Sequence, residues 1–84
     1  MKQVYCVVVT YDPDQYDQDR VKDHFEEEFI HDGGGYCFVN GYRDEFFYSD
    51  GPIERSSFQP FIRNLRRRKG IKQVSVRVVH DEWE

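Results

Sequence analysis

The chain has 84 residues and a formal net charge of -4, with seven Phe, six Tyr and one Trp. A chain of this length has room for one hydrophobic core, so we expect a single domain over residues 1–84 that ends in an acidic tail at about 80–84. One third of the residues are charged, which argues against a membrane span. The two cysteines, without an export signal, favour a reduced, cytoplasmic setting.

The first two elements are predicted from residues 3–30. The run QVYCVVVTY, residues 3–11, is β-branched and aromatic and predicts a strand, and its apolar character at both alternations is typical of a central one. A helix is then expected to begin at a cap, either Asp14 or Asp17, and to continue to about Ile30. Its apolar stripe recurs every fourth residue: Val21, Phe25 and Phe29. The HDGGG segment that follows is expected to end this helix.

A β-hairpin is predicted over residues 36–48, because Asn40-Gly41 between two apolar runs favours a two-residue type I′ turn. A second helix is expected from a cap at Ser56 or Ser57 to Gly70, with a buried face of Phe58, Phe61, Ile62 and Leu65. Residues 71–79 alternate valines with polar residues and predict the last strand.

The order β-α-β-β-α-β predicts an α+β fold of the ferredoxin-like, split βαβ type. We expect one four-stranded antiparallel sheet in the order 4-1-3-2, with both helices on the same face. This fold carries many unrelated functions, so it does not by itself indicate one.

No catalytic residue, cofactor or metal site is expected. His24 and His31 would lie about 10 Å apart along one helix, too far for a shared zinc ion. Cys6 and Cys37 fall on strands that are not neighbours in the predicted sheet, so we interpret them as packing residues. A minor alternative is a small metal-dependent nuclease that holds Mg²⁺ with Asp12 or Asp14 at the end of the first strand.

Charge is strongly polarised along the chain. Residues 1–50 carry 12 acidic and 4 basic side chains, whereas residues 51–84 carry 8 basic and 4 acidic ones. We expect a protein partner to contact four acidic residues of the first helix: Asp19, Asp23, Glu26 and Glu27. The second helix ends in a basic run: Arg63, Arg66, Arg67, Arg68 and Lys69. These cations complement the negative end of the helix dipole, and the alternative is that they bind RNA or another anion.

The sheet face without helices is expected to expose an apolar patch made of Val7, Tyr36, Phe38 and Phe47. Such a patch indicates a two-fold dimer or a docked partner, unless Trp83 of the tail folds back over it.

The leading interpretation is a small, non-enzymatic intracellular protein that binds and modulates a protein partner, as an inhibitor or accessory subunit. A phage- or plasmid-borne protein whose acidic helix mimics nucleic acid would fit this description. The alternative is an RNA-binding module that uses the basic second helix or the aromatic sheet face. Nucleic acid is not favoured, because the net negative charge repels phosphate.

Overall fold

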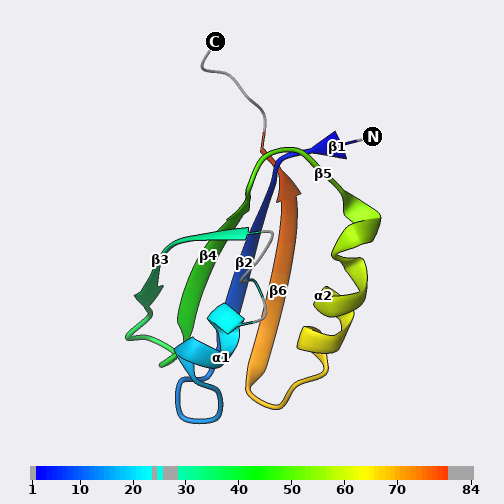
Figure 1. Cartoon of the computed structure of the whole chain (residues 1–84). Coiled ribbons are helices and arrows are strands. Elements are labelled where there is room, and N and C mark those ends of the chain that lie inside the picture. The colour runs from blue at the N-terminus through cyan, green and yellow to red at the C-terminus, as the bar shows by residue number, and fades with distance from the viewer. Residues whose placement is uncertain (1, 24, 26–28, 80–84) are drawn as a thin grey trace.

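The computed structural model describes residues 2–23, 25 and 29–79, and Figure 1 shows how their elements are arranged. In chain order the elements are β1 (Lys2–Gln3), β2 (Tyr5–Tyr11), α1 (Gln18–Asp23), β3 (Phe29–Tyr36), β4 (Arg43–Ser49), β5 (Ile53–Glu54), η1 (Arg55–Ser57), α2 (Gln59–Arg66) and β6 (Ile71–Val78). The fold is α+β, with two α-helices and antiparallel strands.

The larger sheet has four strands in the order β3-β4-β2-β6. The predicted position of the first strand, between the hairpin and the last strand, is therefore confirmed for β2. Val7 is opposite Phe47 on β4 and Val76 on β6, which fixes the register across the middle of the sheet. A second sheet, not predicted, pairs β1 with β5 through Lys2↔Glu54 and Gln3↔Ile53.

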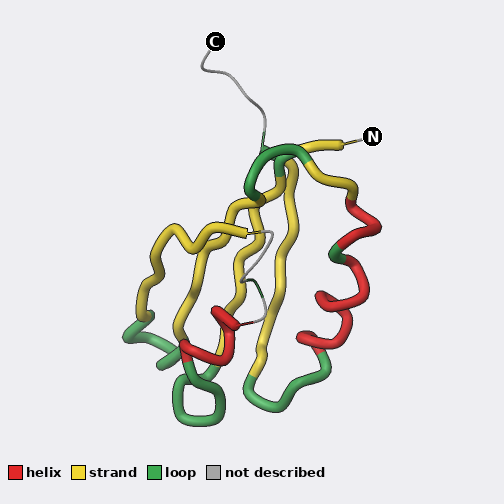
Figure 2. Tube along the Cα trace, in the orientation of Figure 1, coloured by secondary structure: helices red, strands yellow, loops and turns green. Residues whose placement is uncertain are grey.

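Both helices cover the same face of the larger sheet. Val21 of α1 and Ile62 and Leu65 of α2 belong to one core cluster with Val7 and Val9 of β2. Figure 1 shows α2 beside β6, and Figure 2 shows that the α2–β6 loop and the loop before α1 lie at the same end of the molecule.

The first helix is shorter than predicted, and the glycine run does not end it. The carboxylate Oδ1 of Asp17 accepts from the backbone N of Asp19 at 2.7 Å, so Asp17 caps α1 as one of the two predicted caps. The three glycines instead lie inside β3. Gly33 has a φ of +112°, where the register against β4 shifts, so this glycine allows a bulge in an edge strand.

The hairpin turn is two residues longer than predicted. Cys37 N donates to Tyr42 O at 2.8 Å, which leaves residues 38–41 as the loop. A type I′ turn needs positive φ at both central residues, but only Gly41 has it. Asn40 stabilises the loop through its side chain instead, since its Oδ1 accepts from Tyr42 N at 2.9 Å.

The prediction that Val7 and Phe47 lie on the open face was wrong, because these side chains are 0% and 1% exposed beneath the helices. At the tip of the hairpin the register between β3 and β4 differs from the predicted register by an even number of residues. Tyr36 is opposite Arg43, which shares a face of β4 with Phe47, so Tyr36 and Phe47 share a face as predicted. That face is the one the helices cover, because Phe47 is opposite the core residue Val7. The predicted alternation of β6 is confirmed, since Gln73, Ser75 and Arg77 are exposed whereas Val74 is buried.

The second helix buries its predicted face. Phe58, Ile62 and Leu65 are buried and Phe61 is half-buried. The predicted serine cap was wrong: Phe58 is the N-cap and gives no side-chain bond, while Ser57 Oγ donates to Glu54 O. Gly70 follows the helix with a φ of +96°.

The structure bears on the predictions for the two cysteines and for a membrane-spanning helix. Both cysteines are free thiols; Cys6 is buried, as expected of a packing residue, whereas the interpretation of Cys37 as a packing residue was wrong because Cys37 is exposed. Within residues 2–23, 25 and 29–79, no helix has the length and apolar character needed to cross a membrane.

Candidate functional site

A charged side chain, Glu45 of β4, lies on the helix-covered face of the sheet with none of its surface exposed. It is opposite Val9 of β2 and shares a face with Phe47. Burying an isolated carboxylate is very costly, so its oxygens require hydrogen-bond partners.

Four elements supply those partners. Tyr11 Oη of β2 donates to Glu45 Oε2 at 2.8 Å, and His31 Nε2 of β3 lies 2.7 Å from Oε1. Arg43 Nε and Gln18 Nε2 approach Oε2 and Oε1, each at 3.4 Å. A carboxylate that is ionised only accepts, so the tautomer of His31 that fits this contact is the one with its proton on Nε2. We call these five side chains the Glu45 cluster.

The glycine run makes room for this cluster. A Cβ placed on Gly34 would be 2.5 Å from both Asp44 O and Glu45 Oε1, whereas one on Gly35 would meet nothing within 4 Å. The backbone of β3 therefore passes directly over the carboxylate only because residue 34 has no side chain.

Tyr11 holds its phenolic proton firmly within the cluster. Burial, followed by the hydrogen bond and the negative charge of Glu45, raises the pKa of Tyr11 from 10.0 to about 12. Tyr11 is therefore a hydrogen-bond donor throughout the physiological range. Both carboxylate oxygens already have two partners, so the arrangement is suited to joining β2, β3, β4 and α1 rather than to proton transfer.

Sequence reasoning missed the Glu45 cluster. Glu45 was not singled out from the sequence, and His31 was placed on the first helix with His24. The sequence does contain a signal, namely three consecutive glycines and a charged residue, Glu45, that is followed by aromatic residues. The two parts of this signal can be connected only when the pairing of β3 with β4 is known, and that pairing is a tertiary feature.

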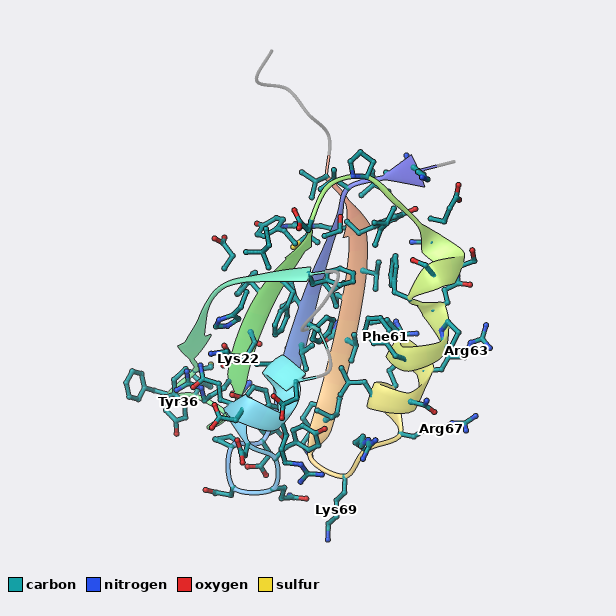
Figure 3. All side chains as sticks on the ribbon, in the orientation of Figure 1. Lys22, Tyr36, Phe61, Arg63, Arg67 and Lys69 are labelled. Carbon is teal, nitrogen blue, oxygen red and sulfur yellow. The ribbon has the colours of Figure 1, made fainter. Side chains whose placement is uncertain are left out.

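A shallow hollow of about 330 Å³ lies beside His31, floored by Phe25, Phe29 and Phe47. Two of the predicted acidic residues, Asp19 and Asp23, are exposed on its rim, together with Lys22, which Figure 3 labels. The other two, Glu26 and Glu27, lie outside the described residues. The predicted acidic surface is thus interrupted by a lysine, and its role as a partner surface stays a prediction.

A second feature is a basic groove between α2 and β6. A hollow of about 240 Å³ has an apolar floor of Phe58, Ile62 and Val76, and its rim is formed by Arg55, Gln59, Arg63 and Arg66. On the far side of Arg66 a further hollow of about 340 Å³ is lined by Ile71, Lys72, Gln73 and Val74. We call the two hollows together the α2–β6 groove.

The predicted basic run divides between helix and loop. Arg63 and Arg66 lie in the last turn of α2, whereas Arg67 is its C-cap and Arg68 and Lys69 follow in the loop. Figure 3 shows Arg63, Arg67 and Lys69 pointing away from the sheet. Arg66 turns inward, and its Nη2 donates to Val74 O at 2.8 Å. Only Arg63 and Arg66 of the run therefore line the groove.

The loop carrying Lys69 contacts the acidic loop that precedes α1. Asp12 N donates to Gly70 O at 2.8 Å, and a Cβ on Gly70 would be 2.8 Å from Gln15 Cβ. The Asp12 carboxylate, a suggested metal ligand, accepts from Asp14 N and Gln15 Nε2, each at 2.9 Å. Among residues 2–23, 25 and 29–79, no cluster of three or more potential ligands for a metal ion is found.

The remaining residues of the predicted apolar patch lie at the tip of the β3–β4 hairpin. Tyr36 is 48% exposed and Phe38 is 90% exposed, and their rings meet edge to face with centroids 5.1 Å apart. Figure 3 places Tyr36 on the opposite side of the molecule from Arg63. Exposed aromatic rings and the groove arginines therefore occupy separate surfaces.

No protein-family model matches this chain, and no curated protein sequence matches it.

Proposed function

We propose that this protein is a small, non-enzymatic binding module that docks onto an acidic stretch of a protein partner through the α2–β6 groove. The observation that carries the proposal is that Arg55, Arg63 and Arg66 all line one hollow with an apolar floor. Interfaces commonly place arginines around a small apolar centre, since the guanidinium binds carboxylates with two parallel bonds.

The separation of charge and aromatic rings favours a protein ligand over RNA. Single-stranded RNA is usually held by aromatic rings that stack with bases beside a cationic track. Here the exposed rings of Tyr36 and Phe38 lie away from Arg63. The net charge of -4 also opposes a polyphosphate ligand. RNA binding is the second candidate and an outcome of the test below.

A non-enzymatic role is supported by the state of two acidic side chains, Glu45 and Asp12. The carboxylate of Glu45 is fully engaged by its four partners, and that of Asp12 bonds within its own loop. General acid–base catalysis needs a group positioned to exchange a proton with a substrate, and neither carboxylate is so positioned.

The arrangement of the larger sheet supports a ferredoxin-like assignment, with β1 and β5 as an addition to that plan. We keep as further proposals that the protein acts in the cytoplasm as an inhibitor or accessory subunit.

The proposal is tested by fluorescence anisotropy with a labelled octapeptide of alternating Glu and Thr as the probe. Arg63→Glu reverses a groove charge and is expected to weaken binding by at least about tenfold. Arg67→Glu makes the same charge change outside the groove and is the matched control. It should have a smaller effect at physiological salt, where screening acts over about 8 Å.

Equal losses in both variants would show that only the overall charge matters and would contradict the groove assignment. No binding of the peptide by the parent protein, together with tight binding of a labelled oligouridylate, would replace the protein partner with RNA.

A further inference from the structure

The strand that forms one wall of the groove is an edge strand. β6 is last in the order β3-β4-β2-β6, and over the described part of the chain no strand pairs with its outer side. Exposed strand edges are templates for pairing with another chain, and most proteins cover or interrupt them.

The hydrogen-bond pattern identifies which backbone groups face outward. Val79 N donates to Val4 O at 2.8 Å, so these two residues form a hydrogen-bonded pair directly beyond the Tyr5↔Val78 end of the β2–β6 ladder. Pairs alternate along an antiparallel ladder, so the intervening residues Val74, Val76 and Val78 direct their N–H and C=O groups away from β2. The bond from Arg66 Nη2 to Val74 O agrees with this assignment, because it reaches that carbonyl from the α2 side.

These outward backbone groups lie in the same groove as the arginines. Val76 lines the hollow formed with Arg55 and Arg63, and Val74 lines the continuation beyond Arg66. A ligand that fills the groove therefore meets main-chain donors and acceptors on one wall and guanidinium groups on the other.

We propose that the acidic stretch of the partner binds in extended form and adds to the sheet as a strand beside β6. This inference rests on the proposed function and specifies its geometry. Three outward positions, Val74 to Val78, extend over about 14 Å at about 3.4 Å per residue, so the contact involves about five residues of the partner.

Charge determines which side chains the added strand presents. Its residues on the helix-covered face lie against Arg63 and Arg66, so acidic side chains belong at alternate positions. Those in between lie beside Ser75 and Arg77 on the other face. The added strand supplies an N–H to Val74 O, which releases Arg66 to bind a carboxylate.

The decisive experiment uses two N-methylated forms of the alternating Glu and Thr octapeptide, one methylated at the Glu amides and the other at the Thr amides. A strand uses the amides of one alternation only, so one form should bind at least about tenfold more weakly while the other binds like the parent peptide. Weak binding of the form methylated at Glu indicates an antiparallel strand, and weak binding of the form methylated at Thr indicates a parallel one.

The result separates this inference from the proposed function. Equal binding of both methylated forms would overturn strand addition while leaving the acidic groove ligand in place, and equal loss would also overturn it. No binding of the unmethylated peptide would remove the proposed function itself.

A protein variant gives an independent measurement. Val76→Pro removes an outward N–H, which an edge strand tolerates, and should weaken binding of the unmethylated peptide by a similar factor. Val76→Thr keeps this N–H and should bind the peptide as tightly as the parent protein does. Circular dichroism checks that both fold. A dimeric parent in light scattering, with a monomeric Val76→Pro variant, would assign the edge to a second copy of this chain and overturn the proposal.

Discussion

Removal of the Tyr11 hydroxyl tests how much the Glu45 cluster contributes to stability. Tyr11 is fully buried, and its Oη donates to Glu45 Oε2 at 2.8 Å. In Tyr11→Phe the ring keeps its shape, so no cavity opens, but Oε2 retains only the longer contact of 3.4 Å from Arg43.

The size of the effect follows from this geometry. A hydrogen bond to a charged group contributes about 1.5–3 kcal/mol to the free energy of unfolding. A domain of 84 residues is stable by about 4–13 kcal/mol in total. We expect a loss of about 2 kcal/mol, which lowers Tm by about 8–16 °C for a domain of this size.

The measurement is urea unfolding at pH 7 followed by circular dichroism, with an unchanged m value showing that the two end states are comparable. Tyr36→Phe is the matched control, since Tyr36 is half-exposed at the hairpin tip. Its free energy of unfolding should stay within about 0.5 kcal/mol of the parent. If Tyr11→Phe proved as stable as this control, the cluster would not hold the fold together as argued.

The same variant changes the alkaline limit of stability. The pKa of Tyr11 rises from 10.0 in the unfolded chain to about 12 in the fold, so the native state holds this proton more tightly. The resulting stabilisation, on the order of 2–3 kcal/mol, is fully present below pH 10 and is lost as the pH rises towards 12. Between pH 9 and pH 11.5 the free energy of unfolding, measured with urea, should fall less in Tyr11→Phe than in the parent protein. Identical decreases in the two proteins would contradict this assignment.

Three further substitutions, two of them with a matched control, are tested by urea unfolding. Gly34→Ala places a Cβ 2.5 Å from Glu45 Oε1 and should lower the free energy of unfolding by about 1–3 kcal/mol. In Gly35→Ala the added Cβ meets nothing within 4 Å, so the loss should be less than about 1 kcal/mol. A larger loss in Gly35→Ala than in Gly34→Ala would disprove the close approach. Leu65→Ala empties a fully buried position of α2 and should cost about 2–5 kcal/mol, so a loss below about 1 would contradict its place in the core. Asp17→Ala removes the α1 cap and should cost about 0.5–2 kcal/mol, whereas Asp17→Asn should retain most of that stability.

Local chemistry made several elements readable without coordinates. The β-branched run of β2 predicted a central strand, and the valines of β6 predicted which of its faces is covered. The spacing of Phe58, Ile62 and Leu65 predicted the buried face of α2. Each of these signals comes from side chains within one element, where the period of the helix or strand relates sequence to face.

Tertiary contacts decided the features that the sequence left undetermined. The apolar spacing of Phe25 and Phe29 suited a longer helix, but Phe29 begins an edge strand that pairs with β4. Whether Glu45 and Phe47 meet water or the helices depended on which side of the sheet α1 and α2 cover, and a hairpin's own alternation does not specify this.

The α2–β6 groove and the Glu45 cluster likewise depend on tertiary contacts. The four consecutive cations after Leu65 can be read from the sequence, but the contact of Arg66 with Val74 O and the position of Arg63 beside Arg55 on the groove cannot. Similarly, the sequence shows that residues 33–35 are glycines, but only the β3–β4 register placed one of them over a buried carboxylate. Periodicity specifies which residues of an element share a face, whereas a site made from several elements depends on how those faces pack together.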